Sequence, residues 1–204
     1  MKSGIFEIDG VEYPDADASD PVALGWMQGS PPPPAKLIRF QDDKFLEFPQ
    51  IRWTLSHMRE LAPTAAVWRG AGERSDLGVA PLGLEASIDA LAFVDLHGRK
   101  LTWAQSLKHT YTDGIVVLHR GRRIYERYFG ALQEQQRPHA CFSITKSYAA
   151  TLCAALMHEG ALDEAKTVSH YLPEMIGTAY EDASLRQVLD MQIGVEYSEL
   201  YADP

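Results

Sequence analysis

The amino-acid sequence predicts an α+β fold, in which a helical region accompanies an antiparallel sheet, and three stretches carry this prediction. Residues 114–119 are apolar and β-branched, and after an Arg-Gly-Arg turn residues 123–129 alternate apolar and polar side chains, which is typical of a β-hairpin. Residues 143–159 are rich in Ala and Leu and stop at a glycine, as expected of a helix. A shorter helix is expected over residues 185–191, because Ser184 opens a capping-box pattern.

Residues 1–50 are expected to form an irregular, Pro-rich leader, and residues 51–204 to form a single domain portion. Ser30 is followed by four prolines, which favour extended polyproline II over helix. The aromatic residues Phe45 and Phe48 indicate that the leader packs on the body of the protein. A disordered linker is the alternative for this segment.

Three short elements are expected between the leader and the hairpin. Residues 54–61 have helical spacing, and Pro63 ends that helix within two turns. Residues 89–94 have the composition of a strand that leads into a turn. Thr102 is a suitable N-cap for a short helix that begins at the following residue, Trp103.

Composition and charge exclude several classes of protein. With 46% hydrophobic and 23% charged residues, the chain has enough apolar material to bury a core. The net charge of -9 argues against a general nucleic-acid binder, which needs a basic face for phosphates. No apolar run reaches the roughly 18 residues of a membrane span, and the first residues lack the apolar core of a secretory signal. We therefore expect a cytoplasmic protein that binds neither nucleic acid nor membrane.

The histidines and cysteines show no metal-site or disulfide pattern. The seven histidines lack the H-x-x-x-H spacing of zinc ligands. If Cys141 and Cys153 lie on one helix, they are roughly 18 Å apart, beyond the limit of about 7 Å for a disulfide. Gly-rich phosphate loops are also absent from the sequence. We expect no metal and no cofactor.

Ser143 and Lys146 form the one motif that points to specific chemistry. Their spacing places a hydroxyl and an amine on the same face at the start of the predicted helix. Serine is a weak nucleophile until a base takes its proton, and a desolvated, neutral lysine can do so. A helix N-terminus adds a positive dipole end, and the Ser143 backbone N–H can stabilise an oxyanion. The spacing alone is equally consistent with a polar helix N-terminus whose residues have no catalytic role.

The strings around this motif resemble a known family. Residues 141–147 (CFSITKS) and 159–163 (EGALD) resemble the serine-hydrolase branch of the β-lactamase-related superfamily. Residues 188–197 (VLDMQIGVEY) and the final Tyr-Ala-Asp-Pro are similar to the 6-aminohexanoate-dimer (nylon-oligomer) hydrolases. Shorter upstream matches to that family are Arg52-Trp53, Ser56-His57-Met58 and Tyr111-Thr112-Asp113.

This resemblance implies a fold and a mechanism. The fold would be that of β-lactamases and penicillin-binding proteins. Ser143 would be the acylated nucleophile, Lys146 its base, and Tyr201 a residue that contacts the substrate amide. Such enzymes hydrolyse small-molecule amides of ω-amino acids or short esters, and they use neither metal nor cofactor.

The sequence also departs from the family. A later catalytic tyrosine and a later strand with the second oxyanion donor have no counterpart before Pro204. We therefore expect only the nucleophile half of the site, with the later sheet strands absent and little activity in this chain alone. Unpaired sheet edges would favour homo-oligomers or other association.

Two other readings stay open. The chain could be a non-catalytic binding or structural remnant of the fold, which the missing motifs would explain. It could also belong to an esterase or penicillin-binding relative with a different range of substrates.

Overall fold

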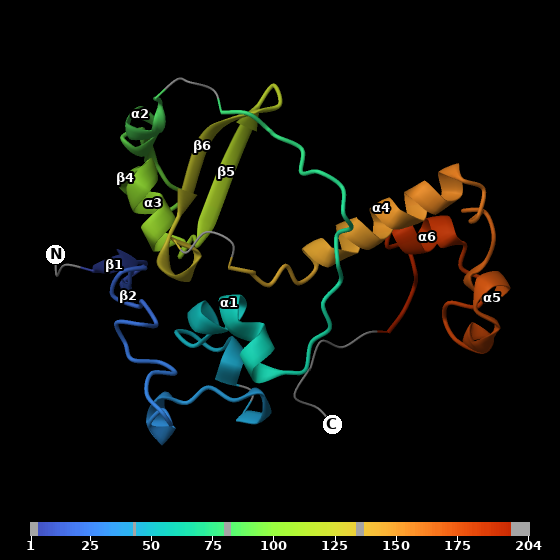
Figure 1. The fold of residues 1–204 in the computed structure, drawn as a ribbon, viewed down its shortest axis with the longest axis horizontal. Helices are drawn as coiled ribbons and strands as arrows, with labels where there is room; N and C mark the ends of the chain where they lie inside the picture. Colours follow the sequence, from blue (N-terminus) through green and yellow to red (C-terminus); the bar gives the residue numbers. More distant parts are fainter. Residues whose placement is uncertain (1–3, 43, 80–82, 134–136, 197–204) are drawn as a thin grey trace. The chain divides into compact units, whose positions relative to one another are not determined.

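The computed structural model describes residues 4–42, 44–79, 83–133 and 137–196, and the chain divides into two compact units (Figure 1). The N-terminal unit comprises Met1–Ala140, and the C-terminal unit comprises Cys141–Pro204. Three antiparallel two-stranded sheets are found among the described residues, and all of them belong to the N-terminal unit.

The helices and strands of the N-terminal unit are, in chain order, β1 (Ile5–Ile8), β2 (Val11–Pro14), α1 (Ile51–Leu61), α2 (Glu85–Asp89), β3 (Ala92–Val94), β4 (Lys100–Thr102), α3 (Trp103–His109), β5 (Gly114–His119) and β6 (Arg122–Tyr128). The helices of the C-terminal unit are α4 (Ile144–His158), α5 (Val168–Tyr171) and α6 (Leu185–Leu189). Single 3₁₀ turns fill several of the connections in both units.

The leader is not irregular throughout, because β1 and β2 form a hairpin. Its turn is Asp9-Gly10, and both residues have positive φ, 49° and 83°, as a two-residue hairpin turn requires. Between this hairpin and α1, the described residues form three short 3₁₀ turns joined by irregular chain. Hydrogen bonds tie the leader to later residues: Tyr111 Oη donates to the Pro14 carbonyl at 2.7 Å, and the Ala16 amide donates to the Lys108 carbonyl at 3.1 Å.

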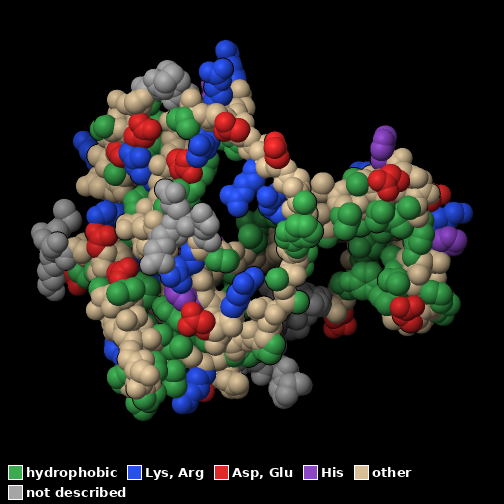
Figure 2. Space-filling view, in the orientation of Figure 1, with side chains coloured by type: hydrophobic (Ala, Val, Ile, Leu, Met, Phe, Trp, Pro, Cys, Tyr) green, Lys and Arg blue, Asp and Glu red, His purple; other side chains and the backbone are tan. Residues whose placement is uncertain are grey.

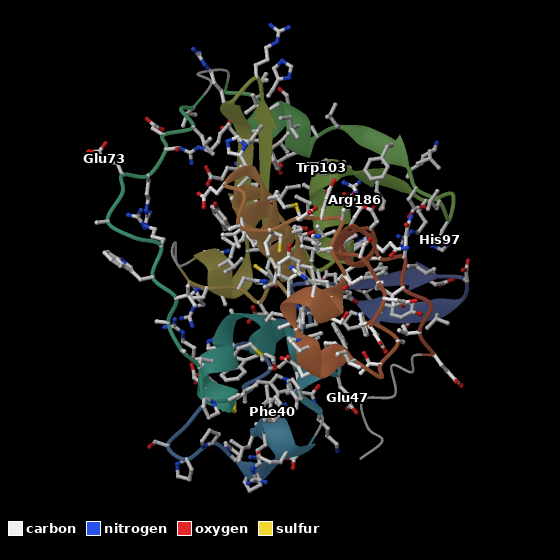
Figure 3. The ribbon with its side chains drawn as sticks, turned by 90° about the vertical axis from the view of Figure 1, so that its right-hand side faces the viewer. Phe40, Glu47, Glu73, His97, Trp103 and Arg186 are labelled. Atoms are coloured by element: carbon white, nitrogen blue, oxygen red, sulfur yellow. The ribbon has the colours of Figure 1, made fainter. Side chains whose placement is uncertain are left out.

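The N-terminal unit is organised around a few buried side chains from distant parts of the sequence. Tyr125 on β6 is 1% exposed, and its ring meets that of Trp103, labelled in Figure 3 at the start of α3, edge to face at 6.4 Å. Phe6 of β1 stacks on His109 at 4.2 Å. Further buried apolar residues of this unit are Ala16, Ile38, Trp53, Leu101 and Leu107.

Local sequence rules predicted several elements of this unit. The hairpin is confirmed as β5 and β6, and its turn residues Arg120 and Gly121 have φ values of 50° and 75°. Thr102 caps α3 as expected, accepting from the Gln105 amide at 3.2 Å. Helix α1 begins at Ile51, three residues before the predicted start.

The prediction of a strand over residues 89–94 was wrong at its beginning. Asp89 ends helix α2, and the strand β3 covers only Ala92–Val94. The helix is favoured because Asp89 accepts a hydrogen bond from Tyr125 Oη at 2.5 Å and forms an ion pair with Arg127 at 2.9 Å. Those long-range partners on β6 cannot be read from local composition.

The C-terminal unit is built mainly from α4 and shorter helical turns. Helix α4 confirms the prediction over residues 143–159, and Gly160 follows it with φ 76°. None of its side chains is buried; Ile144, Tyr148 and Leu152 are each more than 60% exposed. Figure 2 shows hydrophobic side chains gathered on the visible face of this unit.

A second capped helix, α6, completes the described part of the C-terminal unit. Ser184 and Gln187 form the predicted capping box, with the Gln187 amide 3.2 Å from Ser184 Oγ and the Ser184 amide 2.9 Å from Gln187 Oε1. Arg186, labelled on α6 in Figure 3, pairs with Asp190 one turn later at 2.8 Å. The helix ends at Leu189, two residues earlier than expected.

Candidate active site

The structure brings Ser143 and Lys146 together at the start of α4. Lys146 Nζ donates to Ser143 Oγ at 2.9 Å, so the amine nitrogen and the hydroxyl are within hydrogen-bonding distance. Ser143 is the N-cap residue of the helix, and Lys146 lies one turn into it. Helical spacing is sufficient to place the two groups side by side, as the sequence predicts.

A tight turn leads into the helix at Ser143. Phe142 has φ 42°, a left-handed conformation that costs a residue with a side chain about 1–2 kcal/mol. The turn closes with hydrogen bonds from the Ile144 amide to the Cys141 carbonyl and from the Thr145 amide to the Phe142 carbonyl, both 3.0 Å. No hydrogen bond of the Ser143 backbone N–H is found among the described residues, which leaves that group able to serve a ligand.

The environment of the pair differs from what its proposed chemistry needs. Both Ser143 and Lys146 are exposed. Burial favours the neutral form of a lysine, and the described residues do not bury Lys146. A substrate or further protein atoms would have to exclude water from this pair before Lys146 could act as a base.

Tyr201, the expected substrate contact, lies outside the described residues. Among the described residues, no group of three or more His, Cys, Asp or Glu side chains is arranged to hold a metal ion. The search for membrane-spanning helices in the same residues found none of sufficient length and apolar character. Cys141 is exposed and Cys153 is half-buried, and neither forms a disulfide.

Sequence reasoning missed the side chains that hold the segment ahead of Ser143. His57 on α1 has Nδ1 2.7 Å from the Trp53 carbonyl, an acceptor, so Nδ1 carries the proton. The other ring nitrogen, Nε2, is then unprotonated and accepts a hydrogen bond from Arg137 Nη1 at 2.8 Å. The His57 ring also stacks on Trp53 with centroids 4.2 Å apart, which fixes its orientation.

A second contact joins the same segment to the start of β5. His139 Nε2 lies 3.1 Å from Asp113 Oδ2, and an ionised carboxylate can only accept. Asp113 also faces Arg52 at 3.9 Å, and its side chain is 16% exposed. Only position could have revealed His139: it stands four residues before Ser143, whereas its partner Asp113 is 26 residues away along the chain.

Two comparisons of sequence relate the chain to known proteins. The family model described as Beta-lactamase matches residues 102–204. A 6-aminohexanoate-dimer hydrolase from Paenarthrobacter ureafaciens is 38% identical over 192 residues, which are 94% of this chain and 41% of the relative. The chain therefore spans about two fifths of the length of that relative.

The folded structure agrees with these matches. A Bacillus anthracis protein assigned as a 6-aminohexanoate-dimer hydrolase superposes with a TM-score of 0.67 and 30% sequence identity, over 76% of this chain and 38% of that protein. This likeness confirms the predicted α+β fold of the β-lactamase type. Because the matched residues 102–204 take in half of the chain and include both Ser143 and Lys146, the chain belongs to the beta-lactamase family.

Proposed function

We propose that the protein is a serine hydrolase that cleaves an amide or ester bond through an acyl-enzyme, with Ser143 as nucleophile and Lys146 as base. The observation that carries the proposal is the 2.9 Å contact between Lys146 Nζ and Ser143 Oγ at the N-terminus of α4. The family match and the related hydrolase from P. ureafaciens support it.

In the proposed reaction, neutral Lys146 takes the Ser143 hydroxyl proton as Oγ attacks the substrate carbonyl carbon. The carbonyl oxygen becomes an oxyanion, which the Ser143 backbone N–H can stabilise. The C–N or C–O bond then breaks, and the leaving amine or alcohol carries away the proton. Water hydrolyses the acyl-enzyme, which releases the acid and restores the serine.

We propose a small-molecule substrate of the class that the relatives' names suggest, a short oligomer of 6-aminohexanoate, or a short acyl ester. Tyr201 is the proposed contact for the substrate amide. This assignment rests on the resemblance of residues 188–197 and of the final Tyr-Ala-Asp-Pro to the nylon-oligomer hydrolases.

The nucleophile is tested by treating the full-length gene product with a fluorophosphonate and locating the adduct by mass spectrometry. Ser143→Ala should abolish labelling, and Lys146→Met should slow it by about 10²–10⁴-fold, the usual contribution of a general base. Ser147→Ala and Lys166→Met are matched controls, because both residues are exposed in the same unit and lie outside the pair. An adduct elsewhere, or unchanged labelling of Ser143→Ala, contradicts the proposal.

The substrate class is tested by comparing turnover of the linear 6-aminohexanoate dimer, p-nitrophenyl acetate and a chromogenic β-lactam. Amide cleavage of the dimer supports the proposed class. Turnover of the ester alone would instead support the hypothesis of an esterase, and turnover of the β-lactam that of a penicillin-binding relative. Binding of the dimer without turnover or adduct would favour the non-catalytic reading.

A further inference from the structure

The leader hairpin, defined as β1, β2 and the turn between them, packs on the end of α3 through one aromatic side chain. Phe6 of β1 is 8% exposed, and the ring of His109, the last residue of α3, stacks on it at 4.2 Å with the ring planes 12° apart. The Arg99 guanidinium lies over the Phe6 ring at 5.4 Å, and its Nη1 donates to the Glu7 carbonyl at 3.2 Å. Tyr13 of β2 completes the cluster, 5.7 Å from Phe6. The leader hairpin is therefore held through a ring that already faces one cation.

The two ring nitrogens of His109 have different surroundings. Nδ1 is buried and has no hydrogen-bond partner among the described residues, whereas the same is not true of Nε2. A buried N–H without an acceptor is rare because it costs the free energy of a lost hydrogen bond, so the neutral ring carries its proton on Nε2. The proton that charges the ring must then go to the buried Nδ1, where no acceptor receives it.

The charges around His109 act in opposite directions. Asp15 and Asp95 favour a charged ring, although Asp95 is itself paired with Arg99 at 2.7 Å. Burial of the ring, and then the charge of Arg99, outweigh the two carboxylates and lower the pKa of His109 below its ordinary value of 6.5. Burial raises the pKa of Tyr111, so its phenol stays neutral over the same range. Folding therefore favours the neutral form of His109.

The remaining charged contacts of the leader do not weaken in acid in the same way. Lys108, the neighbour of His109 on α3, pairs with Asp17, and both side chains are largely exposed. His97, labelled in Figure 3, lies 3.5 Å from Asp9 in the turn of the leader hairpin. A charged His97 attracts that carboxylate, so this pair opposes release of the hairpin.

We infer that His109 is an acid-sensitive latch: its neutral ring holds the leader hairpin on α3, and a proton on Nδ1 releases the hairpin. The hold is complete above pH 6.5 and is lost as the pH falls below that value, through the lowered pKa of the folded state. The latch is separate from the proposed hydrolysis, because all of its residues belong to the N-terminal unit.

The test follows hydrogen exchange by mass spectrometry in the full-length gene product, expressed as protection factors between about pH 5 and about pH 7.5, on both sides of the histidine range. His109→Phe keeps an aromatic ring on Phe6 but cannot be protonated, and His109→Lys carries a charge throughout. His97→Gln is the matched control, because it removes the other histidine that faces the hairpin. Residues 114–128, which contain β5 and β6, report unfolding of the unit as a whole.

We expect the protection of residues 5–14 in the unsubstituted protein to fall by about 5- to 100-fold over this range, the factor that corresponds to a buried donor left without an acceptor. His109→Phe should keep its protection at every pH, and His109→Lys should lack it already at about pH 7.5. His97→Gln should show the same fall as the unsubstituted protein. The protection of residues 114–128 should not change with pH in any of these proteins.

Three results overturn the inference. One is constant protection of the leader hairpin across the range in the unsubstituted protein. Another is an undiminished fall in His109→Phe, which assigns the pH dependence to a different group. The third is an equal loss of protection in residues 114–128, which shows that the whole unit unfolds. If His109→Lys does not fold, His109→Phe still decides, because it keeps the ring and stays neutral.

Discussion

The contacts within the N-terminal unit differ in kind from the contacts within the C-terminal unit. In the N-terminal unit, side chains reach partners far along the sequence: Arg52 binds Ala16 and Ser19, and Tyr111 binds Pro14. In the C-terminal unit, the described side-chain contacts span less of the sequence: Ser169 Oγ donates to the Glu181 carbonyl 12 residues away, and Arg186 pairs with Glu164, 22 residues away. Ser143 and Lys146 thus belong to the unit whose described contacts span the shorter distances along the sequence.

This comparison can be tested with one convenient probe. The four tryptophans, Trp26, Trp53, Trp68 and Trp103, all belong to the N-terminal unit. Tryptophan fluorescence therefore reports unfolding of that unit, whereas hydrogen exchange by mass spectrometry follows each unit separately.

Arg52→Met should have the largest effect on stability. The residue is 7% exposed and holds both the leader and Asp113, so its loss leaves buried acceptors and a carboxylate without their main cation. We expect a loss of about 3 kcal/mol in the urea unfolding followed by tryptophan fluorescence. Arg59→Met, on the exposed end of the same helix, is the control and should change stability by less than about 0.5 kcal/mol. Equal effects of the two substitutions would show that the leader is not held through Arg52.

Tyr125→Phe should destabilise the same unit less. The substitution removes the 2.5 Å hydrogen bond to Asp89 but keeps the buried ring and the Arg127 pair. A loss of about 1–2 kcal/mol is expected from the same fluorescence measurement at pH 7. An effect above that of Arg52→Met would reverse the ranking on which the comparison rests.

The same variant has a defined pH dependence. Burial, and then the hydrogen bond to Asp89, raise the pKa of Tyr125 to about 12, so folding favours the protonated phenol. Stability from this group is complete below pH 10, its unfolded value, and is lost as pH rises through about 12. The advantage of the unsubstituted protein over Tyr125→Phe should therefore shrink between pH 10 and 12. A constant difference across that range would contradict the assignment.

Ser184→Ala should act only within the C-terminal unit. It removes the cap of α6, which typically costs about 1 kcal/mol, and exchange in residues 184–190 should rise accordingly. The tryptophan transition should not move. A shifted tryptophan transition would mean that the two units unfold together.

Leu152→Gln should have the smallest effect. Leu152 is 62% exposed on α4, so little apolar area is lost from a buried contact within the described residues. We expect a change below about 0.5 kcal/mol in exchange-derived stability of α4. A loss of 2 kcal/mol or more would show that this face of α4 is covered in solution.

Local rules account for what the sequence predicted well. The cap at Thr102, the Arg120-Gly121 turn and the helix start at Ser143 each depend on neighbours within four residues. The contact between Ser143 and Lys146 follows from the same helical spacing. The hairpin of the leader also carried such a signal, because Asp9-Gly10 is a favoured hairpin turn, and it was overlooked.

Long-range partners account for what the sequence could not predict. The end of α2 at Asp89 depends on Tyr125, 36 residues later, and the hydrogen-bond partner of His139 is Asp113, 26 residues earlier. Hydrophobic periodicity and capping patterns carry no information about such pairs. The exposure of Lys146 was equally unpredictable, since spacing sets which groups meet but not what covers them.

The left-handed backbone at Phe142 has a consequence for tolerance to mutation. Phe142 is 56% exposed, and an exposed surface position ordinarily accepts most residues. Here the backbone restricts the choice, so a saturation library should retain glycine, asparagine and aspartate more readily than valine, isoleucine or proline. Selection at this position would then follow the shape of the main chain rather than the chemistry of the side chain.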